Sequence, residues 1–128
     1  MENITLTSSP TTPYFPEVNF NVDSGICEIK GESYMEETYK FYLPIINWIK
    51  DYTKNINKPL ELNIKLIYLN TSSTKCVLDM LEILKDYEDA GGKVKVNWYF
   101  DKSDPDMVDE VEDFEAESGM KIELKEFE

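Results

Sequence analysis

A run of alternating apolar residues near the middle of the chain leads directly into an amphipathic helical pattern. The alternating residues are Leu60, Leu62, Ile64, Leu66 and Tyr68, and Ile67 and Leu69 add apolar side chains on the other face. Apolar residues on both faces predict a central β-strand that is covered on both sides. A polar segment joins this strand to the helix and consists of Asn70, Thr71, Ser72 and Ser73.

The helix after this segment has a regular apolar side and a clear end. Its inward residues are predicted to be Val77, Leu78, Leu81, Leu84 and Tyr87. Gly91 and Gly92 then end it, because glycine readily adopts the left-handed conformation found after helices.

Similar patterns on either side extend the predicted sheet. Val18, Phe20 and Val22 alternate with polar residues before the turn at 23–25, so residues 18–30 predict a β-hairpin. Further strands are predicted at 94–100 and, at an edge, around 122–127. Helices between the strands act as crossovers, which makes these strands parallel.

The first predicted helix follows Ser33, and Glu36 stands three residues later, at the spacing of a capping box. Its main apolar stripe is predicted to comprise Tyr39, Tyr42, Leu43, Ile46 and Ile49, while Ile45 and Trp48 indicate a second buried face. Pro44 lacks the N–H that a helix interior uses, so we expect a kink or a later helix start.

These elements predict an α/β fold with a single mixed β-sheet, an N-terminal hairpin, parallel strands and about three helices. Residues 17–128 are expected to form one domain, since 128 residues usually fold around one core. Residues 1–16 contain Pro10, Pro13 and Pro16, and they predict an extended, loosely held arm.

Charge and composition exclude several classes of function. The net charge is −13, which opposes binding to nucleic acids and to anionic membrane surfaces. The chain has no histidine, so Ser-His-Asp and Cys-His hydrolases and His-ligated zinc sites are excluded. Cys27 and Cys76 lack the C-x-x-C spacing and are predicted to be reduced, buried thiols. A signal peptide and a run of ~20 apolar residues are absent, so we expect a cytoplasmic protein without cofactor or metal.

The polar segment at 70–73 is the strongest candidate site. It opens a helix, and helix N-termini carry partial positive charge that favours anions. One hydroxyl there can serve simply as the N-cap. A small-molecule anion-binding module is a second alternative, although no Gly-rich nucleotide loop is present. Phosphorylation of a hydroxyl is the third, because Lys75, one turn on, can balance the added charge.

A third helix is predicted at 105–118, with Pro105 at its first position and Gly119 after its end. Its apolar stripe is narrow and comprises Met107, Val108, Val111 and Phe114. The intervening residues are acidic, and they form a solvated face, a docking surface for a basic partner, or a cation site without EF-hand spacing. A carboxylate base of an enzyme is a further hypothesis for this helix.

Two motifs, taken together, resemble those of a known family. The first is Gly31, Glu32, Ser33 and Tyr34, and the second is Asn70, Thr71, Ser72 and Ser73 with Lys75. With Phe41, Tyr42, Trp48 and the Val94-x-Val96-Asn97-Trp98-Tyr99 strand, they resemble the SiaC family of bacterial regulatory phosphoproteins over nearly the whole chain. Met35 stands where this family usually has proline.

The resemblance implies a STAS-like fold, similar to that of anti-sigma-factor antagonists, and a regulatory protein that is not an enzyme. It implies that Thr71 is phosphorylated by a partner protein kinase and dephosphorylated by a PP2C-like phosphatase. The other residues of the two motifs are then the surroundings of the phosphosite or part of the partner-binding surface. The unphosphorylated form is expected to bind and activate a diguanylate cyclase, which links the switch to cyclic-di-GMP signalling and biofilm formation.

Overall fold

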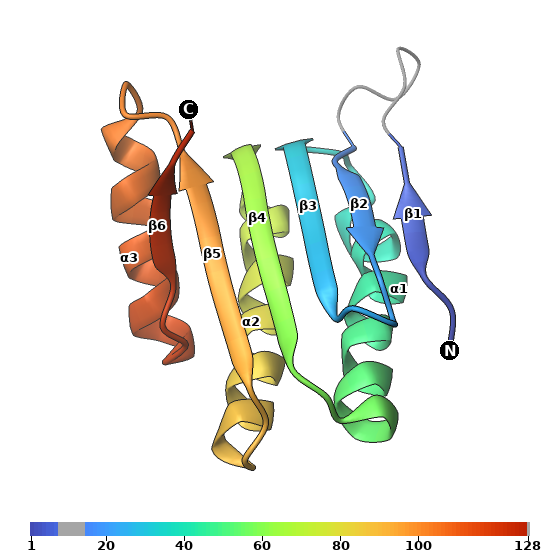
Figure 1. The fold of residues 1–128 in the computed structure, drawn as a ribbon. Coiled ribbons are helices and arrows are strands. Elements are labelled where there is room, and N and C mark those ends of the chain that lie inside the picture. The colour runs from blue at the N-terminus through green and yellow to red at the C-terminus, as the bar shows by residue number, and fades with distance from the viewer. Residues whose placement is uncertain (8–14, 128) are drawn as a thin grey trace.

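The strands lie side by side in the same order as in the sequence (Figure 1). The structure is a computed structural model and describes residues 1–7 and 15–127. Within these ranges the six-stranded sheet is made of β1 (Ile4–Leu6), β2 (Glu17–Phe20), β3 (Ile26–Ser33), β4 (Leu60–Leu69), β5 (Val94–Phe100) and β6 (Glu123–Glu126). β1, β2 and β3 pair antiparallel, and β3 to β6 pair parallel. The predicted mixed α/β sheet with an N-terminal hairpin is confirmed.

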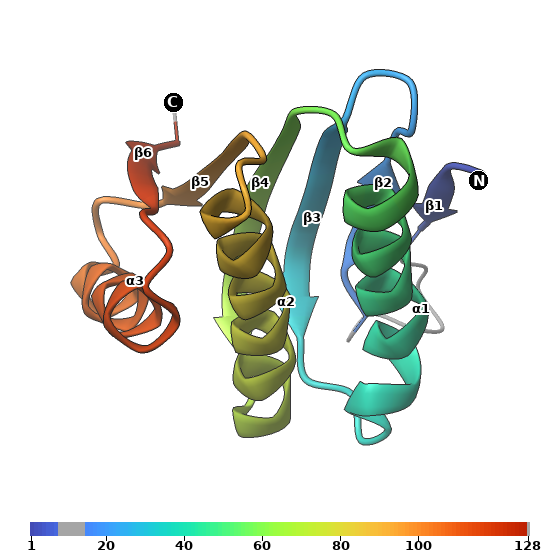
Figure 2. The same cartoon turned by 90° about the horizontal axis from the view of Figure 1, so that it is seen from below.

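The helices lie together on one face of this sheet (Figure 2). They are α1 (Thr38–Asp51), extended by the π-helical turn η1 (Tyr52–Ile56), α2 (Thr71–Asp89) and α3 (Pro105–Ser118). The prediction that β4 is covered on both faces is therefore wrong. Its inward residues from Leu60 to Leu66 are buried, whereas Glu61, Asn63 and Lys65 on the other face are only half-buried.

Polar contacts replace a second helical layer on that other face. Lys65 Nζ lies 2.9 Å from a Glu28 carboxylate oxygen and 4.9 Å from the centre of the Tyr99 ring. Asn97 Nδ2 donates to Asn63 Oδ1 at 2.9 Å. These contacts join side chains of neighbouring strands on the face that no helix covers.

The first helix differs from its prediction. Ser33 is the last residue of β3 and is fully buried, and α1 begins at Thr38, so the predicted capping box is wrong. Tyr39 and Leu43 are exposed, whereas Ile45 and Trp48 are buried, which confirms the second apolar face. α1 continues through Pro44.

The third helix matches its prediction closely. Pro105 is its first residue, and Asp104 caps it by accepting a hydrogen bond from the Met107 N–H at 3.4 Å. Gly119 follows the helix with a φ of 75°, a left-handed conformation that glycine adopts without steric cost.

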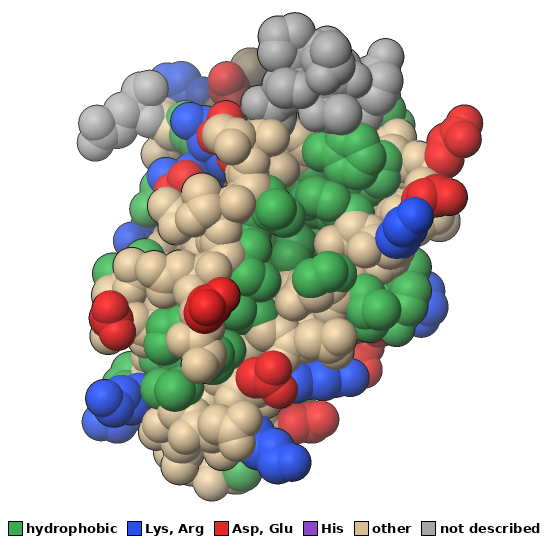
Figure 3. Space-filling view, turned by 90° about the vertical axis from the view of Figure 1, so that its right-hand side faces the viewer, with side chains coloured by type: hydrophobic (Ala, Val, Ile, Leu, Met, Phe, Trp, Pro, Cys, Tyr) green, Lys and Arg blue, Asp and Glu red, His purple; other side chains and the backbone are tan. Residues whose placement is uncertain are grey.

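Part of the predicted N-terminal arm belongs to the sheet. β1 lies along β2, and the Asn3 Oδ1 atom accepts a hydrogen bond from the Val22 N–H at 2.8 Å. Trp48 Nε1, on α1, donates to the Glu2 carbonyl at 2.8 Å. Figure 3 shows apolar side chains gathered across this side of the molecule. The remainder of the arm, residues 8–14, lies outside the described residues.

Ile64 and Ile67 provide a matched test of the one-sided core. Ile64 is fully buried, whereas Ile67 of the same strand is 52% exposed. Ile64→Ala should lower the free energy of unfolding by about 2–5 kcal/mol, and Ile67→Ala by less than ~1 kcal/mol. Urea denaturation measures both, and equal losses would contradict a core confined to one face.

Candidate functional site

Asn70 organises the junction between β4 and α2. It is the N-cap of α2, and its Oδ1 atom accepts a hydrogen bond from the Ser73 N–H at 2.9 Å. Its own N–H donates to the Ser33 carbonyl at 2.9 Å, and its Nδ2 donates to the Met35 carbonyl at 3.3 Å. The possibility that Thr71, Ser72 or Ser73 is the N-cap is therefore excluded.

The two motifs singled out in the sequence meet at this junction. Ser73 Oγ lies 2.9 Å from the Ser33 carbonyl and 2.7 Å from Ser33 Oγ. Both side chains are fully buried. Ser73 therefore fastens the first turn of α2 to the end of β3 and is not an accessible hydroxyl.

The four consecutive hydroxyl residues of α2 differ sharply in their availability. Ser73 is buried, and Thr74 Oγ1 donates to the Asn70 carbonyl at 3.2 Å. Thr71 and Ser72 are exposed, and the Thr71 hydroxyl makes no hydrogen bond within the described residues. Thr71 is also the first residue of α2, where backbone N–H groups lack intrahelical acceptors.

Ser72 faces a different environment from Thr71. It lines an open hollow of about 420 Å³ between the N-terminal turns of α1 and α2. The hollow is lined by Glu36, Glu37, Thr38, Tyr39, Lys40, Ser72, Lys75, Cys76 and Asp79. Lys75 Nζ lies 4.0 Å from Asp79 Oδ1, and Lys40 Nζ lies 3.6 Å from Glu37 Oε2, so carboxylates already accompany both ammonium groups. This arrangement disfavours the anion-binding alternative.

A β-bulge shapes the surface that precedes Thr71. Gly31 pairs with Leu66 but Glu32 pairs with Tyr68, so Ile67 is an extra residue in β4. Gly31 has a φ of 114° at this point, a conformation that side-chain-bearing residues rarely adopt.

The predicted alternation places Tyr68 inward, but the bulge turns this residue outward. Ile67 and Tyr68 are each 52% exposed, and the ring of Tyr68 meets that of Tyr34 edge-on at 5.3 Å. We call Tyr34, Ile67 and Tyr68 the aromatic corner. Exposed apolar side chains grouped in this way are typical of protein-binding surfaces.

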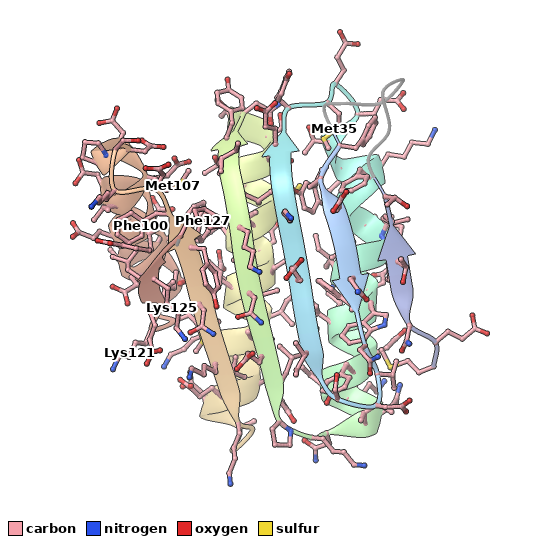
Figure 4. The ribbon with its side chains drawn as sticks, turned by 45° about the horizontal axis from the view of Figure 1, so that its top comes forward. Met35, Phe100, Met107, Lys121, Lys125 and Phe127 are labelled. Carbon is pink, nitrogen blue, oxygen red and sulfur yellow. The ribbon has the colours of Figure 1, made fainter. Side chains whose placement is uncertain are left out.

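Met35 occupies the connection from β3 to α1 (Figure 4). Its side chain is buried, and its carbonyl accepts hydrogen bonds from Asn70 Nδ2 and, at 2.8 Å, from Thr38 Oγ1. The entrance to α1 is therefore fixed by hydrogen bonds to a backbone carbonyl, without a proline at this position.

The acidic helix and the cysteines carry side chains of the kinds that can bind a metal ion. No group of three or more Cys, Asp or Glu residues in the described parts of the chain is arranged to hold a metal ion. Cys27 and Cys76 are buried free thiols, and burial raises the pKa of each. Among residues 1–7 and 15–127, no helix is both long and apolar enough to cross a membrane.

Comparison with known proteins identifies the family. The family described as "SiaC family regulatory phosphoprotein" matches residues 9–127. The chain belongs to the SiaC family. It is 30% identical to an uncharacterised protein of Pseudomonas aeruginosa strain UCBPP-PA14, over 91% of this chain and 92% of that one.

Solved structures of SiaC from Pseudomonas aeruginosa have the same fold. Apo-SiaC is 26% identical and matches with a TM-score of 0.88 over 98% of this chain and 99% of that one. A structure of the diguanylate cyclase SiaD in complex with its activator SiaC matches at 26% identity with a TM-score of 0.86, over 95% and 100% of the two chains. This SiaC-family chain is thus a regulatory protein whose solved relative activates an enzyme.

Three features of the junction between β4 and α2 are not predicted by the sequence analysis. Tyr42 reaches the site, with its hydroxyl 2.7 Å from Ser33 Oγ, although the helical pattern marks it only as a core residue. The capping role of Asn70 was open to detection, since asparagine is among the best N-cap residues. In the sequence, Gly31 is the only residue whose type indicates the bulge.

Glu110 of α3 allows a test of how the acidic helix packs. Burial raises the pKa of Glu110, and the carboxylates of Asp104 and Asp113 raise it further. The folded state therefore binds the Glu110 proton more tightly than the unfolded state does. The stability that this proton adds is present at low pH and is lost as pH rises through the raised pKa, where the half-buried carboxylate becomes charged.

Glu110→Gln should therefore stabilise the protein at pH 7, and the gain should disappear below the ordinary glutamate value of 4.5. Urea denaturation across pH measures this effect. Glu112→Gln, at an exposed position of α3, removes the same charge and is the control. An equal gain from the two variants at pH 7 would show that net charge, and not burial of Glu110, is responsible.

Proposed function

We propose that this protein is a partner switch that is phosphorylated on Thr71 by a protein kinase and dephosphorylated by a PP2C-like phosphatase. The observation that carries the proposal is the exposure of the Thr71 hydroxyl at the first position of α2. Thr71 is exposed and makes no side-chain hydrogen bond to residues 1–7 or 15–127, whereas Ser73 and Thr74 are engaged by Ser33 and Asn70. A kinase can reach this hydroxyl without unfolding α2.

The surroundings favour Thr71 over Ser72 as the acceptor. A phosphate on Ser72 would enter the hollow, where the carboxylates of Glu36, Glu37 and Asp79 outnumber the ammonium groups of Lys40 and Lys75, so the net negative charge would oppose it. A phosphate on Thr71 stands at the N-terminus of α2, where the helix dipole stabilises anions. Lys75 lies one turn further on the same side of α2, within reach of that phosphate.

The two covalent steps use the Thr71 oxygen in opposite senses. In phosphorylation, Thr71 Oγ1 attacks the γ-phosphorus of ATP, the bond from that phosphorus to the bridging oxygen breaks, ADP leaves, and the hydroxyl proton passes to a base of the kinase. In dephosphorylation, water attacks the phosphorus, the bond from phosphorus to Thr71 Oγ1 breaks, inorganic phosphate leaves, and the threonine oxygen takes up a proton. This chain supplies the attacking oxygen in the first step and the leaving oxygen in the second.

The unphosphorylated form is proposed to bind and activate a diguanylate cyclase. The SiaC relative in complex with SiaD supports this partner class. The aromatic corner, which directly precedes Thr71, offers apolar surface that a partner can bury. A phosphate of charge about −1.5 to −2 at its margin would have to be desolvated in such an interface, so phosphorylation should release the partner.

Thr71 and Thr74 are a matched pair for testing the acceptor. After incubation with the cognate kinase and Mg-ATP, intact mass and peptide fragmentation should find one phosphate on wild type and on Thr74→Ala, both at residue 71. Thr71→Ala should remain unmodified, because the other hydroxyls are engaged or face carboxylates. Phosphate uptake by Thr71→Ala at the wild-type level would show that the acceptor is another residue.

A further inference from the structure

Three buried hydroxyl groups from different elements form a continuous chain beneath the candidate phosphosite. Tyr42 of α1 has its hydroxyl 2.7 Å from Ser33 Oγ at the end of β3. Ser33 Oγ lies in turn 2.7 Å from Ser73 Oγ in the first turn of α2. All three side chains are fully buried.

The direction of each hydrogen bond follows from the end of the chain. Ser73 Oγ lies 2.9 Å from the Ser33 carbonyl, which can only accept, so the single hydroxyl proton of Ser73 is donated there. Ser33 must then donate its proton to Ser73, and Tyr42 must donate to Ser33. A contact of 4.0 Å from Ser33 Oγ to Met35 Sδ is the weaker alternative for the Ser33 proton.

One backbone carbonyl accepts hydrogen bonds from both ends of the first turn of α2. The Ser33 carbonyl accepts from the Asn70 N–H and from the Ser73 hydroxyl, each at 2.9 Å. The two residues between these anchors, Thr71 and Ser72, are the ones that remain exposed. Fastening the turn at both ends therefore determines which hydroxyl groups face outward.

We propose that Tyr42 is a positioning residue for the phosphoacceptor. Its hydroxyl group directs the Ser33 proton to Ser73, which holds the first turn of α2 on β3 and presents Thr71 while withholding Ser73. This inference rests on the proposed phosphorylation of Thr71 and adds the reason why that residue is selected. Burial raises the pKa of Tyr42 well above its usual range, so the phenol remains a donor at physiological pH.

Tyr52 provides a matched control for removing this hydroxyl. It is also a buried tyrosine, and its hydroxyl donates to the Pro59 carbonyl at 2.9 Å. It follows Tyr42 by ten residues, about 15 Å along a helix, so it lies far from the phosphosite. Tyr42→Phe and Tyr52→Phe each delete one buried hydroxyl group and differ in where they do so.

Amide hydrogen exchange followed by NMR tests the anchoring on the protein alone. Tyr42→Phe should accelerate exchange of the Ser73 and Thr74 amides roughly five- to tenfold relative to wild type, because the first turn loosens. In Tyr52→Phe, the exchange rates of the Ser73 and Thr74 amides relative to those of the other α2 amides should be the same as in wild type. Equal acceleration in both variants, or none in Tyr42→Phe, would overturn the proposal.

Phosphorylation by the cognate kinase tests the selection. In Tyr42→Phe the value of kcat/KM at Thr71 should fall roughly five- to tenfold, and phosphate should appear on Ser73 as well, because the loosened turn no longer keeps that hydroxyl buried. Tyr52→Phe should be modified at Thr71 alone. Phosphate confined to Thr71 at the wild-type rate in Tyr42→Phe would contradict the positioning role. Absence of phosphate on wild-type Thr71 would instead contradict the proposed function, and the exchange measurement would still decide whether the chain of hydroxyl groups anchors α2.

Discussion

The Ser33 carbonyl is the point on which the candidate site depends. It lies at the end of β3 and accepts hydrogen bonds from the Asn70 N–H and from the Ser73 hydroxyl. A buried carbonyl without partners would be costly, and here it joins a strand to the first turn of a helix that is distant in sequence. Since β3 and β4 are parallel neighbours, the end of β3 and the start of α2 meet at the same edge of the sheet. The position of every hydroxyl group from Thr71 to Thr74 follows from this docking.

Neighbouring hydroxyl groups at the candidate site differ in their exposure and in the charges around them. Thr71 is exposed where Ser73 is buried, and its phosphate would meet a helix N-terminus where that of Ser72 would meet carboxylates. The bulge at Ile67 adds an apolar surface directly before the acceptor. Phosphorylation of Thr71, as proposed, would therefore add charge at the surface while the buried anchors beneath it stay in place.

Local sequence patterns predict most helices and strands, but they predict few of the contacts between them. The β4–α2 junction, the hairpin and the caps of α3 follow from alternation, turn residues and the Asp104-Pro105 pair, because those signals lie within a few residues of one another. Ser33 shows the limit of such signals. Its spacing from Glu36 fits a capping box, but its hydroxyl is used by Ser73, forty residues away, and by Tyr42. The uncovered face of β4 could not be inferred from apolar residues alone, since Ile67 belongs to a bulge and is exposed. The choice of Thr71 as phosphoacceptor rests on the family resemblance and stays a prediction.

The most direct test of the switch compares two chemically defined forms of the protein. Wild type and a form carrying phosphothreonine at position 71 are titrated into the cognate diguanylate cyclase, and the rate of cyclic-di-GMP formation is followed. We expect the unmodified form to bind and raise the rate, and the phosphorylated form to leave the rate at its basal value. Equal activation by the two forms would contradict the account.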